Sequence, residues 1–372
     1  RVHGGMFTCK QNLCPKLKSI AFNHLHTRTF IAARVKWVRD SWLDTAVSKE
    51  KNLQQVVSLM TQILNSPSKS LPLSSLSLLK PQLNLSSTVS SFINNYPLFF
   101  TLFQPRPSFP LQVKLTRRAL SLHRETTGLH DTPTIKEDIV ARLGKFLTLT
   151  NSCKLPLTIV DRFRFDLGLP MNYVSSLLCD YPEFFIIREG FNGELYLELV
   201  GPKDKREVSE VQRRAGNRAK RIGFELSYPN GFDLQKRVSN WVAEWQELPY
   251  ISPYENAFHL NRKGDLGEKW MVAVLHEVMW LLVSKKTEKE NLMVLGHYLG
   301  FEDRVRKALI HHPGIFYVSN KNRTHTVVLR EAYRKDMLMV KHPLMGIRFR
   351  YTYLMNKRRR NPKQHRNALF LD

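Results

Sequence analysis

Apolar side chains recur with helical spacing at three places in the chain, and each of these stretches ends in a proline. The spacing is i, i+3, i+4 and i+7, which places four side chains on the buried face of a short amphipathic helix. The three sets are Val89, Phe92, Ile93 and Tyr96; Val174, Leu177, Leu178 and Tyr181; and Val305, Ala308, Leu309 and His312. Because proline cannot continue a helix, Pro97, Pro182 and Pro313 are expected to end the three helices at the same point.

The residues on both sides of these prolines repeat as well. A leucine-rich helical stretch and a short turn come before each helix, and an aromatic pair and strand-like residues come after each proline. FFIIRE-GFNGE-LYLELV and IFYVSN-KNRTH-TVVLRE read as β-hairpins, whereas the first copy, FFTLF-PRPSFP-LQVKLT, has a longer loop broken by prolines. The aromatic pairs are expected to lie mainly in the core. The pattern indicates one unit, near residues 71–116, 157–200 and 288–333.

The predicted fold is therefore helix-rich α+β. A winged-helix-like unit, which is a helix-turn-helix followed by a β-hairpin, is repeated about three times in one elongated domain. The longest apolar run, Trp270–Val283, is shorter than the ~20 residues that span a bilayer and carries His276 and Glu277. We expect it to be a buried helix and expect no membrane association. Trp241 and Trp245 precede it and are expected to pack in a structured linker.

The net charge of the chain indicates which classes of partner it binds. The sequence has 57 Lys and Arg against 32 Asp and Glu, a net charge of +25. An enzyme for small metabolites has no need of this excess, whereas a protein that neutralises phosphate groups does. RNA-binding, DNA-binding and ribosomal proteins are the classes that remain.

The two ends of the chain are basic. No acidic residue occurs before Asp40, and Lys, Arg, Ser and Thr are interleaved with apolar residues there, as in an organellar transit peptide. We expect a transit peptide at residues 1–33, directed to the mitochondrion, with the chloroplast as the alternative, and expect the residues upstream of Met6 to be non-native. Residues 341–372 are expected to form a basic tail.

Catalytic and metal-binding patterns are missing from the sequence. LHEVMW lacks the second histidine of a zinc-protease helix, and no GxxxxGK[ST] phosphate loop occurs. The spacing of Cys9, Cys14, Cys153 and Cys179 matches no zinc pattern. We expect neither enzyme activity nor a cofactor, a metal site or a catalytic residue.

Five segments together resemble the plant organelle RNA recognition domain. They are RVKWVRDSWLD at 34–44, the repeated YPxFF boxes, WQELPYISPYE at 245–255, LHEVMWLL at 275–282, and HHPGIFYVS with TVVLREAY between 311 and 333. The resemblance covers about 34–353, and we assign the domain itself to 34–340. It implies an imported, non-catalytic protein that binds organellar group II intron RNA and promotes its splicing, with other splicing factors as candidate partners.

Clustered basic residues, some beside tryptophans, are the candidate RNA contacts, because arginine pairs with phosphates and stacks on unpaired bases. The candidates are Arg34, Lys36, Trp37, Arg39, Arg117, Arg118, Arg124, Arg162, Arg164, Arg213, Arg214, Arg218, Lys220 and Arg221. The last five fall at near-helical spacing. Two other functions stay open: an organellar DNA-binding winged-helix protein, and a ribosome-associated structural RNA-binding protein.

Overall fold

The computed structural model describes residues 37–201, 207–216, 221–322 and 324–357. The fold is helix-rich α+β with small antiparallel sheets. The predicted transit peptide at 1–33 lies outside the described residues. Within them, no helix has the length and apolar character that crossing a membrane requires.

Three stretches of the chain share one order of elements: strand, helix, helix, strand, strand. The first contains β1 (Ser70–Pro72), α3 (Leu73–Leu78), α4 (Val89–Asn95), β2 (Phe100–Phe103) and β3 (Gln112–Leu115). The second contains β4 (Lys154–Pro156), α7 (Leu157–Leu167), α8 (Leu177–Asp180), β5 (Phe185–Glu189) and β6 (Leu195–Leu199). The third contains β7 (Lys286–Glu288), α12 (Lys289–Tyr298), α13 (Arg304–His311), β8 (Phe316–Ser319) and β9 (Thr326–Leu329). We call them the first, second and third unit.

The three units agree in backbone detail. In each sheet the last strand lies between the other two and is antiparallel to both. In each unit the residue before the proline has a carbonyl oxygen that accepts the N–H groups of the residues three and four positions later, at 2.9–3.3 Å; these acceptors are Tyr96, Tyr181 and His312. The residue before each first strand has a positive φ of 52° or 53°, at Lys69, Cys153 and Lys285. The same local geometry is thus built three times.

Two local features differ from the sequence expectation. Each unit starts with a three-residue strand, too short to show an alternating pattern, so the sheets have three strands where hairpins alone were expected. Helix α8 is shorter than expected, because the N–H of Leu178 bonds to the carbonyl of Tyr173, five residues back. That bond shifts the buried face by one position, so Tyr173 is buried whereas Val174 is 38% exposed.

Helix α11 (Asp265–Leu281) runs through the largest hydrophobic core of the described residues. It is buried along almost its whole length, which confirms the buried helix expected from the apolar run. This core joins the second and third units with α6 (Pro133–Thr148) and α10 (Lys236–Glu247). On α10, Trp241 stacks on the buried Trp245, with ring centroids 6.0 Å apart, so the linker is packed as expected.

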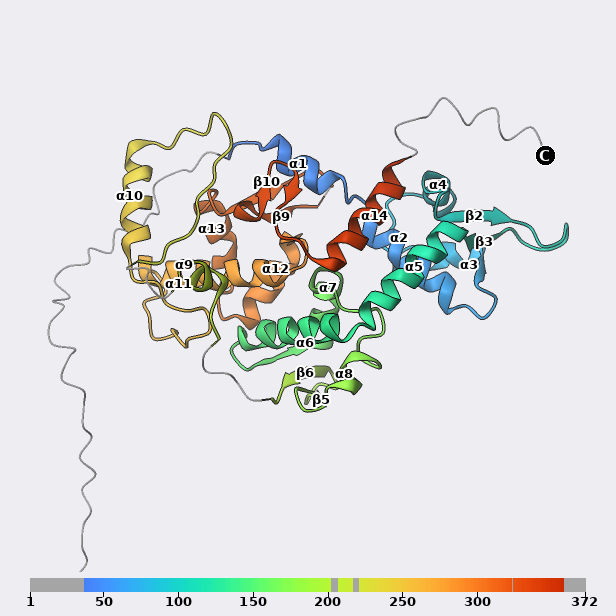
Figure 1. The fold of residues 1–372 in the computed structure, drawn as a ribbon, viewed down its shortest axis with the longest axis horizontal. Coiled ribbons are helices and arrows are strands. Elements are labelled where there is room, and N and C mark those ends of the chain that lie inside the picture. The colour runs from blue at the N-terminus through green and yellow to red at the C-terminus, as the bar shows by residue number, and fades with distance from the viewer. Residues whose placement is uncertain (1–36, 202–206, 217–220, 323, 358–372) are drawn as a thin grey trace, which may run out of the picture.

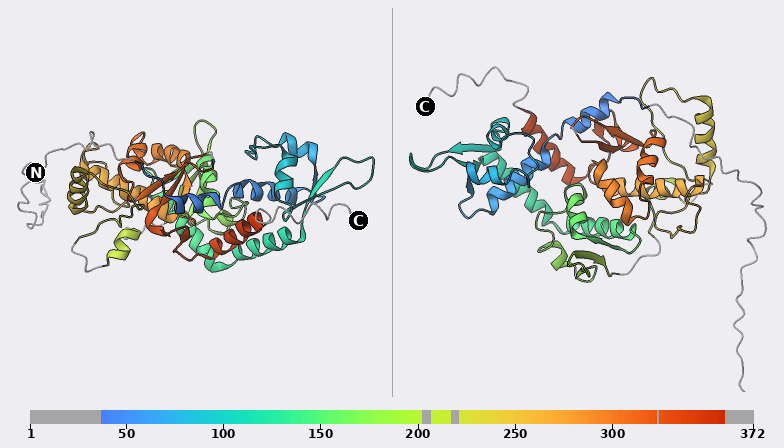
Figure 2. Two further views of the ribbon diagram at one scale, coloured as in Figure 1. Left: turned by 90° about the horizontal axis from the view of Figure 1, so that it is seen from above. Right: turned by 180° about the vertical axis from the view of Figure 1, so that it is seen from behind.

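The second core belongs to the first unit, which forms one end of the molecule (Figure 1). Helices α2 (Leu53–Asn65), α5 (Arg117–His130) and α14 (Pro343–Lys357) enclose it. Figure 2 shows α14 alongside α5, and shows the long β2–β3 hairpin extending away from the body. Smaller elements complete the fold: α1 (Ser41–Ser48), α9 (Glu210–Ala215), η2 (Arg330–Ala332), β10 (Tyr333–Arg334) and β11 (Met337–Leu338).

Helix α14 corrects the boundary expected at residue 340. The segment that was expected to be a basic tail contributes Leu344, Met345, Tyr351 and Met355 to the two cores. Met345 and Tyr351 are six positions apart, and only Tyr351 and Met355 have the spacing of one helical turn, so the sequence shows no continuous helical repeat here. Residues 358–372 lie outside the described part of the chain.

A buried group of charges links the two cores. Glu50, between α1 and α2, forms ion pairs with Lys286 of β7 at 3.0 Å and with Arg348 of α14 at 2.7 Å. Arg348 also lies 3.7 Å from Asp166 of α7, which accepts a hydrogen bond from Thr287 at 2.7 Å. Burial raises the pKa of Asp166 to about 6, against the opposing charge of Arg348. Four distant segments therefore depend on one another for charge balance.

Candidate nucleic-acid interface

Helix α5 carries the first cluster of basic candidates. The Thr116 hydroxyl accepts the N–H of Ala119 at 3.2 Å and donates to the carbonyl of Leu98 at 2.6 Å, which starts the helix directly after β3. Ala119 and Leu122 face the first unit's core. The opposite side is in solvent and presents Arg117, Arg118 and Arg124.

Helix α14 extends this basic surface with residues that the sequence analysis did not assign to it. Arg350 of α14 pairs with Glu125 of α5, and the Tyr351 hydroxyl lies 3.4 Å from that of Thr126. Tyr351 also stacks on Phe99 of the first unit, with ring centroids 5.9 Å apart. The contacts hold α14 along α5, with the side chains of Phe349, Arg350, Tyr353 and Lys357 in solvent.

We call these seven residues the α5–α14 face: Arg117, Arg118, Arg124, Phe349, Arg350, Tyr353 and Lys357. The face combines five cations with two exposed aromatic rings, of which Tyr353 is 61% exposed. The ammonium of Lys357 lies 5.7 Å from the centre of the Tyr353 ring. Cations beside exposed rings can neutralise phosphates and stack on unpaired bases. The helical spacing in FRYTYLMNK could have indicated this face, had the segment been recognised as a helix.

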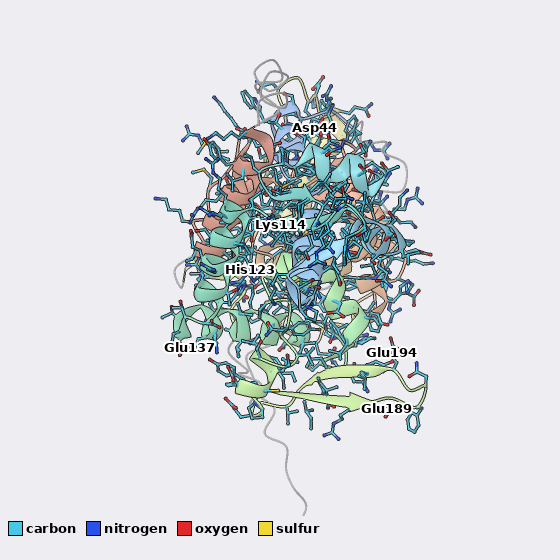
Figure 3. The ribbon with its side chains drawn as sticks, turned by 90° about the vertical axis from the view of Figure 1, so that its right-hand side faces the viewer. Asp44, Lys114, His123, Glu137, Glu189 and Glu194 are labelled. Atoms are coloured by element: carbon cyan, nitrogen blue, oxygen red, sulfur yellow. The ribbon has the colours of Figure 1, made fainter. Side chains whose placement is uncertain are left out.

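The charge of the adjoining units differs in sign. The first unit, residues 70–115, contains Lys80, Arg106 and Lys114 and no Asp or Glu. The second unit, residues 154–199, contains seven Asp and Glu against four Lys and Arg. Figure 3 shows two of these carboxylates, Glu189 and Glu194, on the β5–β6 hairpin, away from Lys114 and His123. Phosphate attraction therefore favours the first unit's end over the second unit's hairpin.

A cavity of about 230 Å³ lies between helices α2, α5 and α14 and the segment that follows α7. Its walls are mostly apolar. Burial lowers the pKa of both His123 and His130, which line it, so both are neutral at pH 7. Uncharged imidazoles in an apolar wall do not attract phosphate, so we leave this cavity out of the interface.

The N-terminal candidates lie against the third unit. Trp37 stacks on Tyr317, with ring centroids 6.2 Å apart, and donates from Nε1 to the carbonyl of Val318 at 3.3 Å. Arg39 pairs with Asp44 at 2.9 Å yet keeps 58% of its side chain exposed. Both can contact a ligand, although Trp37 also has a packing role. Arg34 and Lys36 lie outside the described residues.

The two arginines of α7 are separated by the helix. Arg162 is exposed. Arg164 is half-buried beside the apolar cavity, 3.9 Å from Asp161. They do not form a joint basic patch.

The densest basic run of the sequence is divided by the structure. Helix α9 ends at Ala215, and Gly216 takes a positive φ of 66°, so this helix carries Arg213 and Arg214 but not Arg221. Arg213 is 69% exposed and pairs with Glu210, while Arg221 pairs with Glu247. Arg218 and Lys220 lie outside the described residues.

Arg214 keeps 34% of its side chain exposed but is tied to the fold by ion pairs. Its guanidinium bonds to Glu210 at 2.8 Å and to Glu331 at 3.0 Å, and lies 4.2 Å from the centre of the Trp280 ring. Glu331 also bonds to His276 at 2.7 Å. Burial opposes ionisation of Glu331, but the His276 and Arg214 contacts hold its pKa below the ordinary value. These contacts tie α9 to α11 and the third unit.

Arg214→Ala is expected to destabilise the protein by about 1–3 kcal/mol, because it leaves the buried Glu331 with one partner fewer. Arg213→Ala, one residue away, should cost less than about 1 kcal/mol, since Arg213 is mostly in solvent. Urea unfolding followed by tryptophan fluorescence measures both. Equal losses for the two variants would mean that Arg214 has no special structural role.

The described part of the chain contains no group of three His, Cys, Asp or Glu residues that could hold a metal ion. Cys153 is buried and Cys179 exposed, and both are free thiols.

Comparison with known proteins identifies the family. A family model described as the plant organelle RNA recognition domain matches residues 38–360. The chain belongs to this family. The match confirms the resemblance inferred from the sequence, and it includes α14, beyond the boundary expected at residue 340.

Relatives of the plant organelle RNA recognition domain family match almost the full chain. It is 30% identical to What's This Factor 9, mitochondrial, of Arabidopsis thaliana, over 93% of this chain and 91% of that protein. It is 28% identical to Root Primordium Defective 1 of Arabidopsis thaliana, over 88% and 84%. It is 28% identical to What's This Factor 1, chloroplastic, of Zea mays, over 84% and 65%. No solved structure is significantly similar to the chain.

Proposed function

We propose that this protein is a non-catalytic RNA-binding protein of a plant organelle that binds group II intron RNA and promotes its splicing. The observation that carries the proposal is the α5–α14 face, five cations and two exposed rings within the matched domain. A folded intron brings many phosphates close together. A protein that neutralises them and binds unpaired segments favours the active RNA fold, while the intron RNA performs the chemistry.

The three units are proposed to be winged-helix-like modules. Their element order and central third strand are the support, with the hairpins as the wings. DNA-binding winged helices place the second helix of the unit in a groove. Here the corresponding helices α4 and α8 contain no Lys or Arg, and only α13 does, at Arg304, Arg306 and Lys307. This distribution favours RNA bound at the α5–α14 face over duplex DNA bound by the units.

We propose the mitochondrion as the location. The basic residues 1–33 have the composition of a transit peptide, and the relative What's This Factor 9 is named as mitochondrial. The chloroplast is the alternative, since other relatives are named as chloroplastic. Import of the labelled precursor into isolated mitochondria and chloroplasts, followed by protease treatment, distinguishes the two.

The proposed function is tested by ultraviolet crosslinking of the tagged protein in isolated organelles, with sequencing of the bound RNA. Enrichment of one or a few group II introns is the expected result. The matched control is a variant with Arg117, Arg118 and Arg124 replaced by glutamine, which should lose the enrichment while accumulating normally. Ribosomal RNA alone would support the ribosome-associated alternative, and the absence of crosslinked RNA would reject RNA binding.

A further inference from the structure

A second cavity, of about 360 Å³, lies at the N-terminal end of α1, away from the α5–α14 face. We call it the Trp42 cavity. One wall is formed by residues 39–43, the second by the loop 227–230, and the third by residues of η2 and the following turn. Its volume is in the range of pockets that bind one small ligand group.

The N-terminal wall is anchored by buried hydrogen bonds. Asp44 accepts hydrogen bonds from Tyr317 at 2.9 Å and Ser319 at 2.6 Å, both on β8. Asp40 caps the start of α1 and also pairs with Arg330 at 2.8 Å. The first residues of α1 are thus held on the third unit by hydrogen bonds between residues more than 270 positions apart in the sequence.

The loop wall depends on Gly314 of the HHPGIFY box. The N–H of Ser227 donates to the carbonyl of Gly314 at 2.9 Å. The Tyr228 ring packs directly over Gly314, so closely that a Cβ there would lie 2.6 Å from Tyr228 Cζ. Tyr228 in turn stacks on Phe232, with centroids 4.8 Å apart. A glycine in the third unit thus lets an aromatic side chain form part of the cavity.

The lining of the Trp42 cavity combines an open aromatic ring with an excess of cations. The Trp42 side chain is 51% exposed, and the Lys335 ammonium lies 5.3 Å from its ring centre. Arg39 and Arg330 add two further cations. Arg39 pairs with Asp44 yet keeps 58% of its side chain exposed, and Arg330 pairs with Asp40, the one carboxylate among the lining residues. The Nε of Arg330 is buried and has no acceptor, so this guanidinium retains an unused donor.

We propose that the Trp42 cavity binds one unpaired nucleotide of a single-stranded RNA, with its base against Trp42 and its phosphate near Lys335 and Arg39. Stacking on an indole needs a free base, and the cations beside it match the phosphate that follows. The amide of Asn230, which is one of the lining residues, can both donate to and accept from the edge of a base. The inference rests on the proposed function and adds a defined contact to it.

The test is photocrosslinking of the full chain to single-stranded RNA that contains 4-thiouridine, followed by trypsin digestion and mass spectrometry. The expected crosslink lies in the peptide 40–49, which contains Trp42, or in 222–236, which contains Tyr228. In parallel, Trp42→Ala should lower RNA affinity by about 5- to 100-fold, and Trp42→Phe should restore most of it, because a phenyl ring still stacks.

Phe191→Ala is the matched control, since Phe191 is a fully exposed ring on the acidic β5–β6 hairpin and should not affect affinity. RNA binding with crosslinks elsewhere and no effect of Trp42→Ala would overturn the inference while leaving the proposed function standing. Equal affinity for a free mononucleotide or for an acidic peptide would also overturn it, because the site would then not be for RNA. No RNA binding by the unaltered protein would reject both proposals.

Discussion

Replacement of Arg117, Arg118 and Arg124 together by glutamine is expected to lower the affinity for single-stranded RNA by about 100-fold near 0.1 M salt. Each phosphate contact on a single strand contributes a salt-dependence slope of about 0.7, so three lost contacts remove about 2 from the slope of log K against log salt. The residues are exposed on α5 and glutamine favours helices, so the fold should be kept. Fluorescence anisotropy of labelled RNA across a salt series measures both quantities.

Single variants provide the control for this result. Arg118→Gln should reduce the salt slope by about 0.7. Arg188→Gln should leave it unchanged, because Arg188 is also exposed but lies on the acidic hairpin, 3.0 Å from Glu198. If the triple variant binds with unchanged affinity and slope, α5 is not part of the interface and the α5–α14 face is not an RNA surface.

Arg348→Met is expected to lower the free energy of unfolding by about 3–5 kcal/mol. The substitution leaves Glu50 and Asp166 buried with one cation, Lys286, for two carboxylates, and breaking a buried ion pair from one side has a cost of this size. Methionine is unbranched and keeps an apolar stem beside Phe165, although it is shorter than arginine and does not reach the position of the guanidinium, 4.1 Å from the ring centre. Urea unfolding monitored by circular dichroism measures the loss.

Arg350→Met, two positions further along α14, is the matched control. Arg350 is 56% exposed and pairs with Glu125 at the surface, so its loss should cost less than about 1 kcal/mol. The two variants have the same residue change on the same helix and differ in burial. Equal effects would contradict the role assigned to the buried charges in joining the two cores.

The spacing of apolar residues predicted the buried face of a helix correctly where the helix is regular. The spacing before Pro97 and Pro313 matches the buried faces of α4 and α13. Before Pro182 it does not, because a hydrogen bond over five residues changes the register at Tyr173. A spacing rule assumes regular helix geometry, so one irregular turn is enough to move the buried position.

The sequence predicted the exposure of some candidate RNA contacts correctly but not of others. Arg117, Arg118 and Arg124 were chosen because they cluster in the sequence, and all three are exposed on one helix. Arg214 also lies in a basic stretch of the sequence. In the structure, however, Glu210, Glu331 and Trp280 hold its side chain against the fold. Sequence shows that a residue is charged but not which carboxylate it meets. Glu331, the partner that gives Arg214 its structural role, lies 117 positions away in the chain.

Short-range information was enough to establish that this chain is a basic, repeat-built member of its family. Net charge is a sum over residues, the proline boxes end helices through their own backbone, and family motifs are read in order along the chain. The surfaces required contacts between distant segments. Helix α14 joins α5 through Arg350 and Tyr351, and α1 meets β8 through Asp44, across more than 200 positions. Those pairings depend on packing in three dimensions, so the α5–α14 face and the Trp42 cavity became visible in the folded protein alone.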